Sequence, residues 1–389
     1  MKRVELGEIA EVFGGYAFKS KDFIEKPSVP VIKISNIQNG KVPEKKLKDF
    51  LPNEYLEKYG NYEIKKGDIL VALSGATTGK TGTYLLSRKS LLNQRVGLVR
   101  AIDNLADQKY LSYYVSKITD DILRKAQGVA QPNISTKELS MFKIPLPSLS
   151  EQKAIVAKLD RAQRLVNIDR EMLAKYDELI QSVFLEMFGD PVRNEKGWEL
   201  EKLGDLCGVG SSKRVYVKEL VEEGIPFYRG QEIGKLSEGK ALEPELFVTE
   251  EHYQQLIDHS GKPEIGDLLM PSICPDGRIF IVKNNEKFYF KDGRVLWVKA
   301  GQSEINSFYL RYHLKALFQA NYSEIASGTT FAELKIFALK KLQILNPPIE
   351  LQERFQSEIE RINQDIYRTK SSLKKSEDLF SSLVQGVFS

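Results

Sequence analysis

The chain has 389 residues, of which 42% are hydrophobic and 28% charged, and a formal net charge of +4. This length leaves room for two or more domains with sizeable cores. No apolar run approaches the roughly 20 residues that cross a bilayer, which excludes a membrane-spanning class. Glu5 and Glu8 stand where a secretory signal needs an unbroken apolar stretch, so we expect a cytoplasmic protein.

The cysteines and histidines exclude the usual zinc sites. Cys207 and Cys274 are the only cysteines, and the histidines are scattered at His252, His259 and His313. Structural zinc sites need four such ligands at short, regular spacing. A disulfide is not expected in a reducing compartment either. We therefore expect no metal site in this chain.

Positive charge is concentrated in the first part of the chain. Residues 1–147 hold 24 Lys and Arg against 16 Asp and Glu, a net charge of +8, whereas residues 190–347 hold 21 against 23, a net charge of −2. A basic segment favours a polyanionic partner. Any nucleic-acid contact in residues 190–347 must therefore use a local face.

Residues 1–147, called head one below, have a mixed α and β pattern. Runs of β-branched and aromatic residues predict strands at Val29–Ile34, Asp68–Leu73 and Arg95–Arg100. Apolar residues three and four apart predict a helix over Asp107–Gln127. Polar loops lie between these elements, above all Ser74–Gly82, and recognition usually resides in such loops.

A long helix is predicted over Leu149–Phe188. Ser148 and Glu151 form a capping-box pattern at its start, and Gly189 followed by Pro191 ends it. At 1.5 Å rise per residue such a helix is about 60 Å long and requires a partner helix. Apolar residues at alternating four- and three-residue steps form a coiled-coil seam: Ile155, Leu159, Ala162, Val166, Leu173, Tyr176, Ile180, Val183 and Met187.

The partner helix is predicted 200 residues later, opened by Pro347 and Pro348. Asp169 interrupts the first seam, and Thr369 stands at the matching place in the second. A polar layer there would set the register of the two helices. Two alternatives stay open: Asp169 and Thr369 face solvent or a partner subunit, or the two long helices are ordinary core helices of a globular protein. The second seam repeats the first in phase: Phe355, Ile359, Ile362, Ile366, Leu373, Phe380, Leu383 and Val387.

Residues 190–347, called head two below, repeat the plan of head one. Leu6–Ile9 recurs as Leu203–Leu206. Strands are predicted at Arg278–Val282 and Val295–Val298, and a helix over Ser307–Ile325. We therefore predict an α+β fold in which two mixed α/β heads are joined by an antiparallel coiled coil with an internal pseudo-two-fold repeat. The predicted domains are head one, 1–147; long helix one, 148–189; head two, 190–347; and long helix two, 348–389.

Two motifs are similar to catalytic signatures but do not complete them. Ser74–Thr81 misses the phosphate-binding P-loop because Ser74 replaces its first glycine, and Gly82–Tyr84 does not continue as a helix. Asn346–Ile349 is similar to the catalytic tetrapeptide of adenine methyltransferases, but Ile349 is not aromatic. The sequence also contains no paired carboxylates with lysine and no Ser/His/Asp set above chance. We therefore expect no catalytic site.

The loops of the two heads differ, which favours two unlike DNA half-sites. Ser74–Lys80 in head one has Ser272–Arg278 as its counterpart in head two. Arg can read guanine, Asn or Gln can read adenine, and hydroxyls can read either. In head one we expect DNA contacts from Lys33, Asn36, Ser74, Thr77, Thr78, Lys80, Asn93, Gln94 and Arg95. In head two we expect them from Arg214, Arg229, Gln231, Asp276, Arg278 and Arg294.

The order and duplication of several short phrases resemble the specificity subunit of type I restriction-modification systems. That family has two variable target-recognition domains, separated and followed by two long repeated helices, so the resemblance covers the whole chain. The second half departs from the pattern at Ala332, Glu333 and Leu351. The phrases are Gly14–Ser20, Gly67–Val71, Gln131–Ile134, Ile144–Pro147 with Glu151–Gln152, and Phe188–Pro191 leading to Gly197–Trp198.

The resemblance implies a non-catalytic subunit that reads a bipartite, asymmetric DNA sequence, with each head entering a major groove through its loops. It also implies two methylation subunits that use S-adenosylmethionine, and restriction subunits that use ATP and Mg²⁺; this chain would hold no cofactor itself. The alternative is a coiled-coil interaction scaffold without DNA binding, favoured by the negative head two and distinguished by the salt dependence of binding. A self-sufficient DNA-modifying enzyme would need a cofactor loop or metal cluster that the sequence does not contain.

Overall fold

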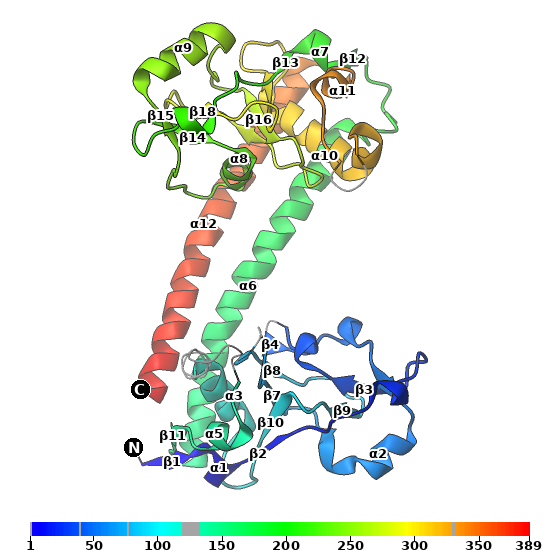
Figure 1. Ribbon diagram of the computed structural model, residues 1–389, viewed down its shortest axis with the longest axis vertical. Coiled ribbons are helices and arrows are strands. Elements are labelled where there is room, and N and C mark those ends of the chain that lie inside the picture. Colours follow the sequence, from blue (N-terminus) through cyan, green and yellow to red (C-terminus); the bar gives the residue numbers. More distant parts are fainter. Residues whose placement is uncertain (1, 39, 76–77, 119–132, 329–331) are drawn as a thin grey trace. The chain divides into compact units, whose positions relative to one another are not determined.

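The computed structural model describes residues 2–38, 40–75, 78–118, 133–328 and 332–389 (Figure 1). The chain divides into two compact units: Met1–Glu171 with Lys370–Ser389, and Met172–Thr369. The first unit contains head one, and the second contains head two. Each also contains part of α6 (Leu149–Phe188) and part of α12 (Ile349–Phe388). None of the helices within the described residues is both long and apolar enough to cross a membrane.

Head one is built around a five-stranded sheet of order β2-β10-β7-β8-β4. Strands β2, β10, β7 and β8 are antiparallel to their neighbours, whereas β4 pairs parallel with β8. The predicted strands Asp68–Leu73 and Arg95–Arg100 are confirmed as β7 and β10. All of β7 and the first four residues of β10 are buried, and the two faces of these strands pack into two different core clusters. The strand bounds are β2 Ala10–Gly14, β4 Gly40–Lys41, β7 Ile69–Ala72, β8 Thr81–Thr83 and β10 Val96–Ala101.

The remaining strands of head one form two smaller sheets. One has the order β5-β3-β9-β6, and β1 pairs with β11 in the other. These strands are β1 Arg3–Glu5, β3 Val29–Ile32, β5 Phe50–Leu51, β6 Glu63–Ile64, β9 Ser90–Leu92 and β11 Lys143–Pro145. The α-helices of this head are α1 Leu6–Ile9, α2 Glu54–Lys58, α3 Gln108–Lys117 and α5 Thr136–Ser140. Residues 119–127 of the helix predicted over Asp107–Gln127 lie outside the described residues.

Head two repeats this plan. Its main sheet has the order β13-β19-β16-β17, which matches β2-β10-β7-β8. The strands are β12 Leu200–Lys202, β13 Gly208–Gly210, β14 Ile225–Tyr228, β15 Phe247–Val248, β16 Leu268–Pro271, β17 Phe280–Ile281, β18 Tyr289–Phe290, β19 Val295–Lys299 and β20 Gln343–Leu345. The helices are α7 Leu203–Leu206, α8 Gly230–Ser237, α9 Glu250–Ser260, α10 Ser307–Ile325 and α11 Ile336–Lys340. The predicted strands and the predicted helix of this head are confirmed.

The repetition extends to individual buried hydrogen bonds. The Tyr110 hydroxyl donates to the Pro145 carbonyl at 2.8 Å, and the Tyr309 hydroxyl donates to the Leu345 carbonyl at 2.7 Å. In both heads this bond joins the helix after the main sheet, α3 or α10, to the strand that precedes a long helix. A buried hydroxyl requires a partner, and each bond ties α3 or α10 to the strand that leads into a long helix.

A pair of glutamines makes the same connection from the long helices. Gln152 in α6 accepts the Asp107 backbone N–H at 2.7 Å, and Gln352 in α12 accepts the Asn306 backbone N–H at 2.9 Å. Both glutamine side chains are buried. The first turn of each long helix is therefore anchored to its own head by a polar contact as well as by packing.

The long helices have the predicted limits. The Ser148 hydroxyl donates to a Glu151 carboxylate oxygen at 2.7 Å, and the Glu151 backbone N–H donates to the hydroxyl at 3.3 Å. Gly189 has a φ of +80° after the last turn of α6, a conformation that favours glycine. The predicted seam positions that follow are all buried or half-buried: Ile155, Leu159, Val166, Leu173, Ile180, Val183, Phe355, Ile359, Ile362, Ile366, Leu373, Phe380 and Leu383.

A polar cluster interrupts the seam. Asp169 is 9% exposed and accepts hydrogen bonds from the hydroxyls of Ser372 and Ser376, both at 3.1 Å. Arg170 forms an ion pair with Glu377 at 2.6 Å beside it. Thr369 is also buried, at 7% exposure. Neither Asp169 nor Thr369 faces solvent, because both lie on the apolar side of their helices.

The core of the first unit is completed from α12. Phe388 packs against Tyr110 and Tyr114, with ring centroids 5.1 and 5.5 Å away. In the second unit Phe188 at the end of α6 packs against Phe355 in α12, with centroids 5.3 Å apart. Both clusters are aromatic, and aromatic side chains bury large areas. Each head therefore has a core that also includes both long helices.

Candidate nucleic-acid interface

Four segments of head one meet at one end of its main sheet. The Leu73 backbone N–H donates to the Arg95 carbonyl at 2.9 Å, and the Asn93 N–H donates to the Ile32 carbonyl at 3.1 Å. The Gln94 N–H donates to the carbonyl of Tyr16 at 3.0 Å. The ends of β3, β7 and β9 are thus brought together, with the loop after β2. This end carries most of the predicted head-one contacts.

The exposed side chains at this end are Lys80, Gln94 and Arg95. Lys80 and Arg95 form no ion pair with any other described residue. Ser74 and Asn93 are half-buried, and the Asn93 side-chain oxygen accepts the Arg95 N–H at 3.4 Å. Two cations that form no ion pair with another described residue, together with the amide of Gln94, offer what phosphate and base contacts need.

The predicted hydroxyl contacts of the β7–β8 loop behave differently. Thr78 is buried, and its hydroxyl donates to the Gly75 carbonyl at 2.7 Å. Such a bond stabilises the loop itself. Thr77, also among the predicted contacts, lies outside the described residues. The loop therefore presents Lys80 to solvent while Thr78 contributes to its conformation.

Lys33 and Asn36 lie in the turn after β3, and both side chains are used within the head. Lys33 forms an ion pair with Asp49 at 2.6 Å and lies over the Phe23 ring. Asn36 is 4% exposed; its oxygen accepts the Lys33 N–H and its amide donates to the Lys46 carbonyl, both at 2.7 Å. Asn36 thus holds the turn through both ends of its amide, and its contact with DNA stays a prediction.

In head two, acidic residues pair with predicted arginines. Arg214 contacts Asp292 at 3.3 Å. Arg278 contacts Asp276 at 2.8 Å, so two of the predicted DNA contacts neutralise each other. Gln231, on the first turn of α8, remains exposed. These pairs are exposed and individually contribute little stability, so they can be exchanged for contacts with a ligand.

The two other arginines are also paired with carboxylates. Arg229 contacts Glu232 at 2.8 Å and Glu245 at 3.5 Å, and its hydrogen bond to Glu232 raises the arginine pKa. Partial burial alone would raise the pKa of Glu232, but hydrogen bonds from the Arg229 side chain and backbone lower it. Arg294 is paired with Glu333. The second head thus presents cations whose charge is partly compensated.

The loop correspondence between the heads differs by one residue from our prediction. Strand β7 pairs with β10 so that Ala72 lies opposite Val96, and in head two Pro271 lies opposite Val295. The equivalent positions are therefore 199 residues apart, and Ser74 corresponds to Ile273 rather than to Ser272. Sequence spacing alone was ambiguous here because the offset changes along the chain.

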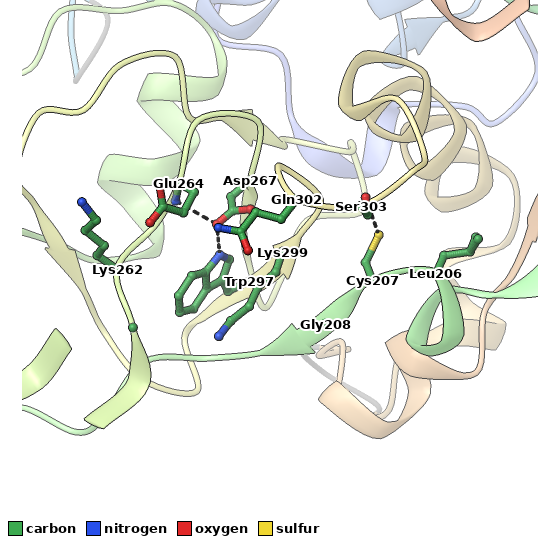
Figure 2. A pocket seen from close by; sticks show the side chains of 11 residues that line it. Leu206, Cys207, Gly208, Lys262, Glu264, Asp267, Trp297, Lys299, Gln302 and Ser303 are labelled. Carbon is green, nitrogen blue, oxygen red and sulfur yellow. Dashed lines mark hydrogen bonds between the residues drawn. The ribbon is translucent and has the colours of Figure 1, made fainter. Parts of the chain in front are cut away.

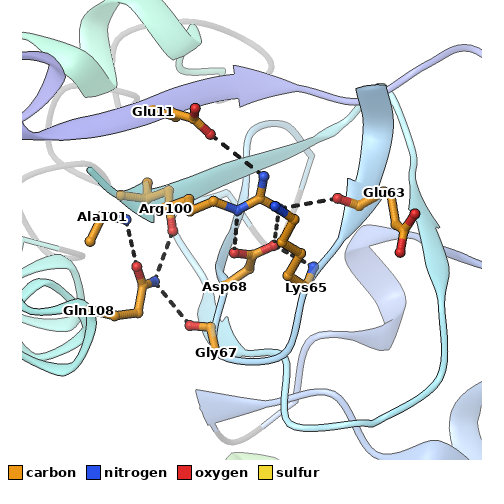
Figure 3. Close-up of polar contacts among 9 residues, drawn as sticks. Glu11, Glu63, Lys65, Gly67, Asp68, Arg100, Ala101 and Gln108 are labelled. Carbon is orange, nitrogen blue, oxygen red and sulfur yellow. Dashed lines mark hydrogen bonds and ion pairs between the residues drawn. The ribbon is translucent and has the colours of Figure 1, made fainter. Parts of the chain in front are cut away.

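An aspartate near the other end of β7 or β16 stiffens each main sheet. In head one Asp68 is 3% exposed and accepts hydrogen bonds from Arg100 at 2.9 and 2.6 Å (Figure 3). In head two the equivalent Asp267 instead accepts the Trp297 indole N–H at 2.8 Å (Figure 2). It also accepts the Gly301 N–H at 3.0 Å. A cavity of about 420 Å³ lies beside Trp297. The same frame is therefore held by different side chains in the two heads.

A family model for the type I restriction modification DNA specificity domain matches residues 1–175 and 195–377. The chain belongs to this family. The two matched segments together cover most of the sequence; the first contains head one, and the second contains head two from residue 195 onward. The family assignment agrees with the resemblance inferred from the order and duplication of short sequence motifs.

Curated members of the family span the chain to different extents. The MjaVIII specificity subunit of Methanocaldococcus jannaschii is 32% identical over 191 residues, 47% of this chain and 44% of that protein, so the match covers less than half of its length. The MjaIX specificity subunit of the same organism is 24% identical over 439 residues, 99% of this chain and 95% of that protein. The S subunit from M. genitalium shares the fold, with a TM-score of 0.54, 16% identity, and coverage of 100% and 96% of the two chains.

Sequence reasoning missed Lys291, which lies in the turn between β18 and β19. It is exposed and stands next to Arg294, one of the predicted contacts. The Asp292–Gly293 pair that follows it is a turn signal between two strands. That signal placed a turn at this end of the sheet and could have identified Lys291.

Proposed function

We propose that this member of the family is a non-catalytic DNA-specificity subunit of a type I restriction-modification complex. In this proposal each head reads one half of a bipartite, asymmetric site. Head one contributes Lys80, Gln94 and Arg95 most directly, with Ser74, Asn93 and Lys33 beside them and Thr77 and Thr78 in the same loop. Head two contributes Arg214, Arg229, Gln231, Asp276, Arg278 and Arg294.

The observation that carries the proposal is the contrast between frame and loops. The main sheets have the same strand order, and Tyr110 and Tyr309 make the same buried hydrogen bond. The side chains at the loop end differ in type and in charge compensation. A repeated frame with unlike loops suits recognition of two different half-sites, whereas a two-fold reader with identical loops would bind a palindrome.

We also propose that α6 and α12 form an antiparallel coiled coil that spaces the heads. In the first unit Asp169 and Arg170 of α6 contact Ser372, Ser376 and Glu377 of α12. In the second unit the end of α6 packs against the start of α12. Contacts that proceed in opposite directions along two helices support antiparallel pairing. The proposed domain limits remain 1–147, 148–189, 190–347 and 348–389.

The proposed partners are double-stranded DNA, methylation subunits and restriction subunits, all in the cytoplasm. The relatives are named as specificity subunits of type I restriction enzymes, a name that supports such partners. S-adenosylmethionine, ATP and Mg²⁺ would be bound by those partners. The role of this chain would be to position them on a chosen sequence.

The test is methylome sequencing of a host that carries this chain with its methylation partner, compared with the same host without the chain. We expect a split motif with two unlike halves to gain adenine methylation only when the chain is present. A chain with head two replaced by that of another family member is the matched control and should change one half of the motif. An unchanged methylome, with the chain still binding proteins, would refute DNA reading and favour the scaffold alternative.

A further inference from the structure

A small pocket in head two is lined by three cationic side chains. Its volume is about 260 Å³, and Arg229, Lys291 and Arg294 line it together with Gly230, Pro271, Ser272 and Ile273. No carboxylate is among these lining residues. Two of the cations were predicted as DNA contacts separately, but the fold brings them to one place with a third.

The backbone around the pocket is well fixed. The Lys291 backbone N–H donates to the Tyr228 carbonyl at 2.9 Å, and the Val295 N–H donates to the Lys291 carbonyl at 3.1 Å. Gly293 has a φ of +63°, and the hydroxyl of Ser211 accepts its N–H at 2.9 Å. The turn that presents Lys291 is therefore tied to β14 and to the segment after β13, which limits its movement.

The carboxylates that pair with the arginines lie outside the lining. Glu232 and Glu245 contact Arg229, and Glu333 contacts Arg294. Lys291 has no ion pair with a residue in the described part of the chain. Each arginine carries five N–H donors. The contacts with these carboxylates use Nε and one terminal nitrogen of Arg229 and one terminal nitrogen of Arg294, so donors remain for the pocket.

Glycine at position 230 keeps the pocket open. A Cβ built on Gly230 would lie 3.2 Å from the Arg294 carbonyl oxygen and 3.4 Å from the Pro271 Cβ. A side chain there would press against the wall that carries Arg294. Gly230, which has no side chain, thus lines the same pocket as the three cations.

We infer that this pocket holds one phosphodiester group of the DNA backbone, with Lys291 and Arg294 as its principal contacts. The inference rests on the proposed function and assigns Arg294 to positioning the head instead of reading a base. All three side chains are donors only, so they fit an anion with several acceptor oxygens. The guanine edge also offers acceptors to an arginine or a lysine, but three cations around one pocket suit the full negative charge of a phosphate, and phosphate contacts fix the register of a protein on the duplex.

The experiment measures DNA affinity as a function of KCl concentration for the full chain purified with its methylation partner. The probes are a duplex selected by the unaltered complex from a random pool and an unselected duplex of equal length. We compare Lys291→Gln with Lys283→Gln. Lys283 is exposed in the same head, next to Val282, whose N–H donates to the Asp267 carbonyl at the far end of β16.

For Lys291→Gln we expect the slope of log affinity against log salt to become shallower by about 0.9, the value for one phosphate contact. The dissociation constant should rise by the same factor on both duplexes, and the selected sequence should not change. Lys283→Gln should retain the original slope. Because a phosphate carries no sequence information, this combination of results distinguishes a phosphate contact from a base contact.

Two results would overturn the inference. An unchanged slope in Lys291→Gln would show that Lys291 contacts no phosphate, and an altered selected sequence would make it a base contact. The salt slope and the selected sequence of Lys291→Gln are both compared with those of an unaltered complex that prefers its selected duplex. If that complex shows no sequence preference at all, the proposed function fails instead, and this outcome is seen before any variant is compared.

Discussion

His313 makes the stability of the second unit depend on pH. It lies in α10, fully buried, and its Nε2 accepts the Leu345 backbone N–H at 3.1 Å. Its Nδ1 has no hydrogen-bond partner in the described structure. Burial lowers the pKa of His313 to about 3. The ring is therefore neutral in the folded protein at neutral pH, and protonation would place a charge among apolar and aromatic side chains.

The direction and size of the effect follow from proton linkage. The folded pKa lies below the unfolded value of about 6.5, so between these values the unfolded chain binds one more proton. The free energy of unfolding then falls as pH decreases, by about 1.4 kcal/mol per pH unit. At pH 5 the loss is about 2 kcal/mol relative to pH 7.5. It stops growing near pH 3, where the folded state also takes up the proton.

The variant His313→Gln separates this contribution from other titrating groups. Its amide oxygen can accept the Leu345 N–H but does not titrate between pH 5 and 7.5. We expect urea unfolding, followed by tryptophan fluorescence, to show a pH-dependent loss smaller by about 2 kcal/mol than in the unaltered chain. Trp198 and Trp297, the two tryptophans of the chain, both lie in the second unit and report on it.

The matched control is His259→Gln, because His259 is exposed in α9 of the same unit. This variant should retain the full pH dependence of the unaltered chain. The reasoning would be refuted if His313→Gln and the unaltered chain lost the same free energy of unfolding between pH 7.5 and pH 5.

Further predictions concern the helices and head one. Asp169→Ala should lower the free energy of unfolding by about 1–3 kcal/mol, because the buried hydroxyl of Ser376 loses its acceptor. Asp169→Asn should cost less, and equal losses in urea titrations would contradict this. Four residues inserted in each long helix should move the heads apart by about 6 Å, under two base pairs, so methylome sequencing should show an altered spacer between unchanged half-sites. Arg95→Gln should reduce discrimination at one base pair by about 1–3 kcal/mol, whereas Lys80→Gln should lower the affinity for all duplexes alike. Both are checked by selection from a random duplex pool. If the Arg95→Gln variant selected the original motif, base reading by Arg95 would be excluded.

The sequence was most informative where local chemistry decides the structure. The limits of α6 followed from Ser148, Glu151 and Gly189, because capping depends on residues a few positions apart. The repeat of strands and helices followed from hydrophobic pattern in the same way. The correspondence between the loops of the two heads could not be predicted in this way, because it depends on which strand residues lie opposite one another.

The candidate site was harder to predict because its side chains are defined by distant partners. Asn36 belongs to a polar stretch that reads as a surface loop, yet its amide closes that turn from within. Arg294 meets Glu333, 39 residues later, and no local pattern indicates such a pair. Lys291 lines the pocket because the β18–β19 turn lies beside the start of α8, which is a property of the tertiary structure.

The first unit is assembled from residues far apart along the chain, and this has a consequence for synthesis. Its core includes Phe380, Leu383 and Phe388 from α12 together with Val4 and Leu6 near the start. During translation, head one must wait for residue 388 before its core can close, whereas Met172–Thr369 forms a continuous segment that is complete earlier. Domains generally fold as units while the ribosome is still adding residues. Head two is thus free to fold first, and a premature stop within α12 would leave head one with an open core.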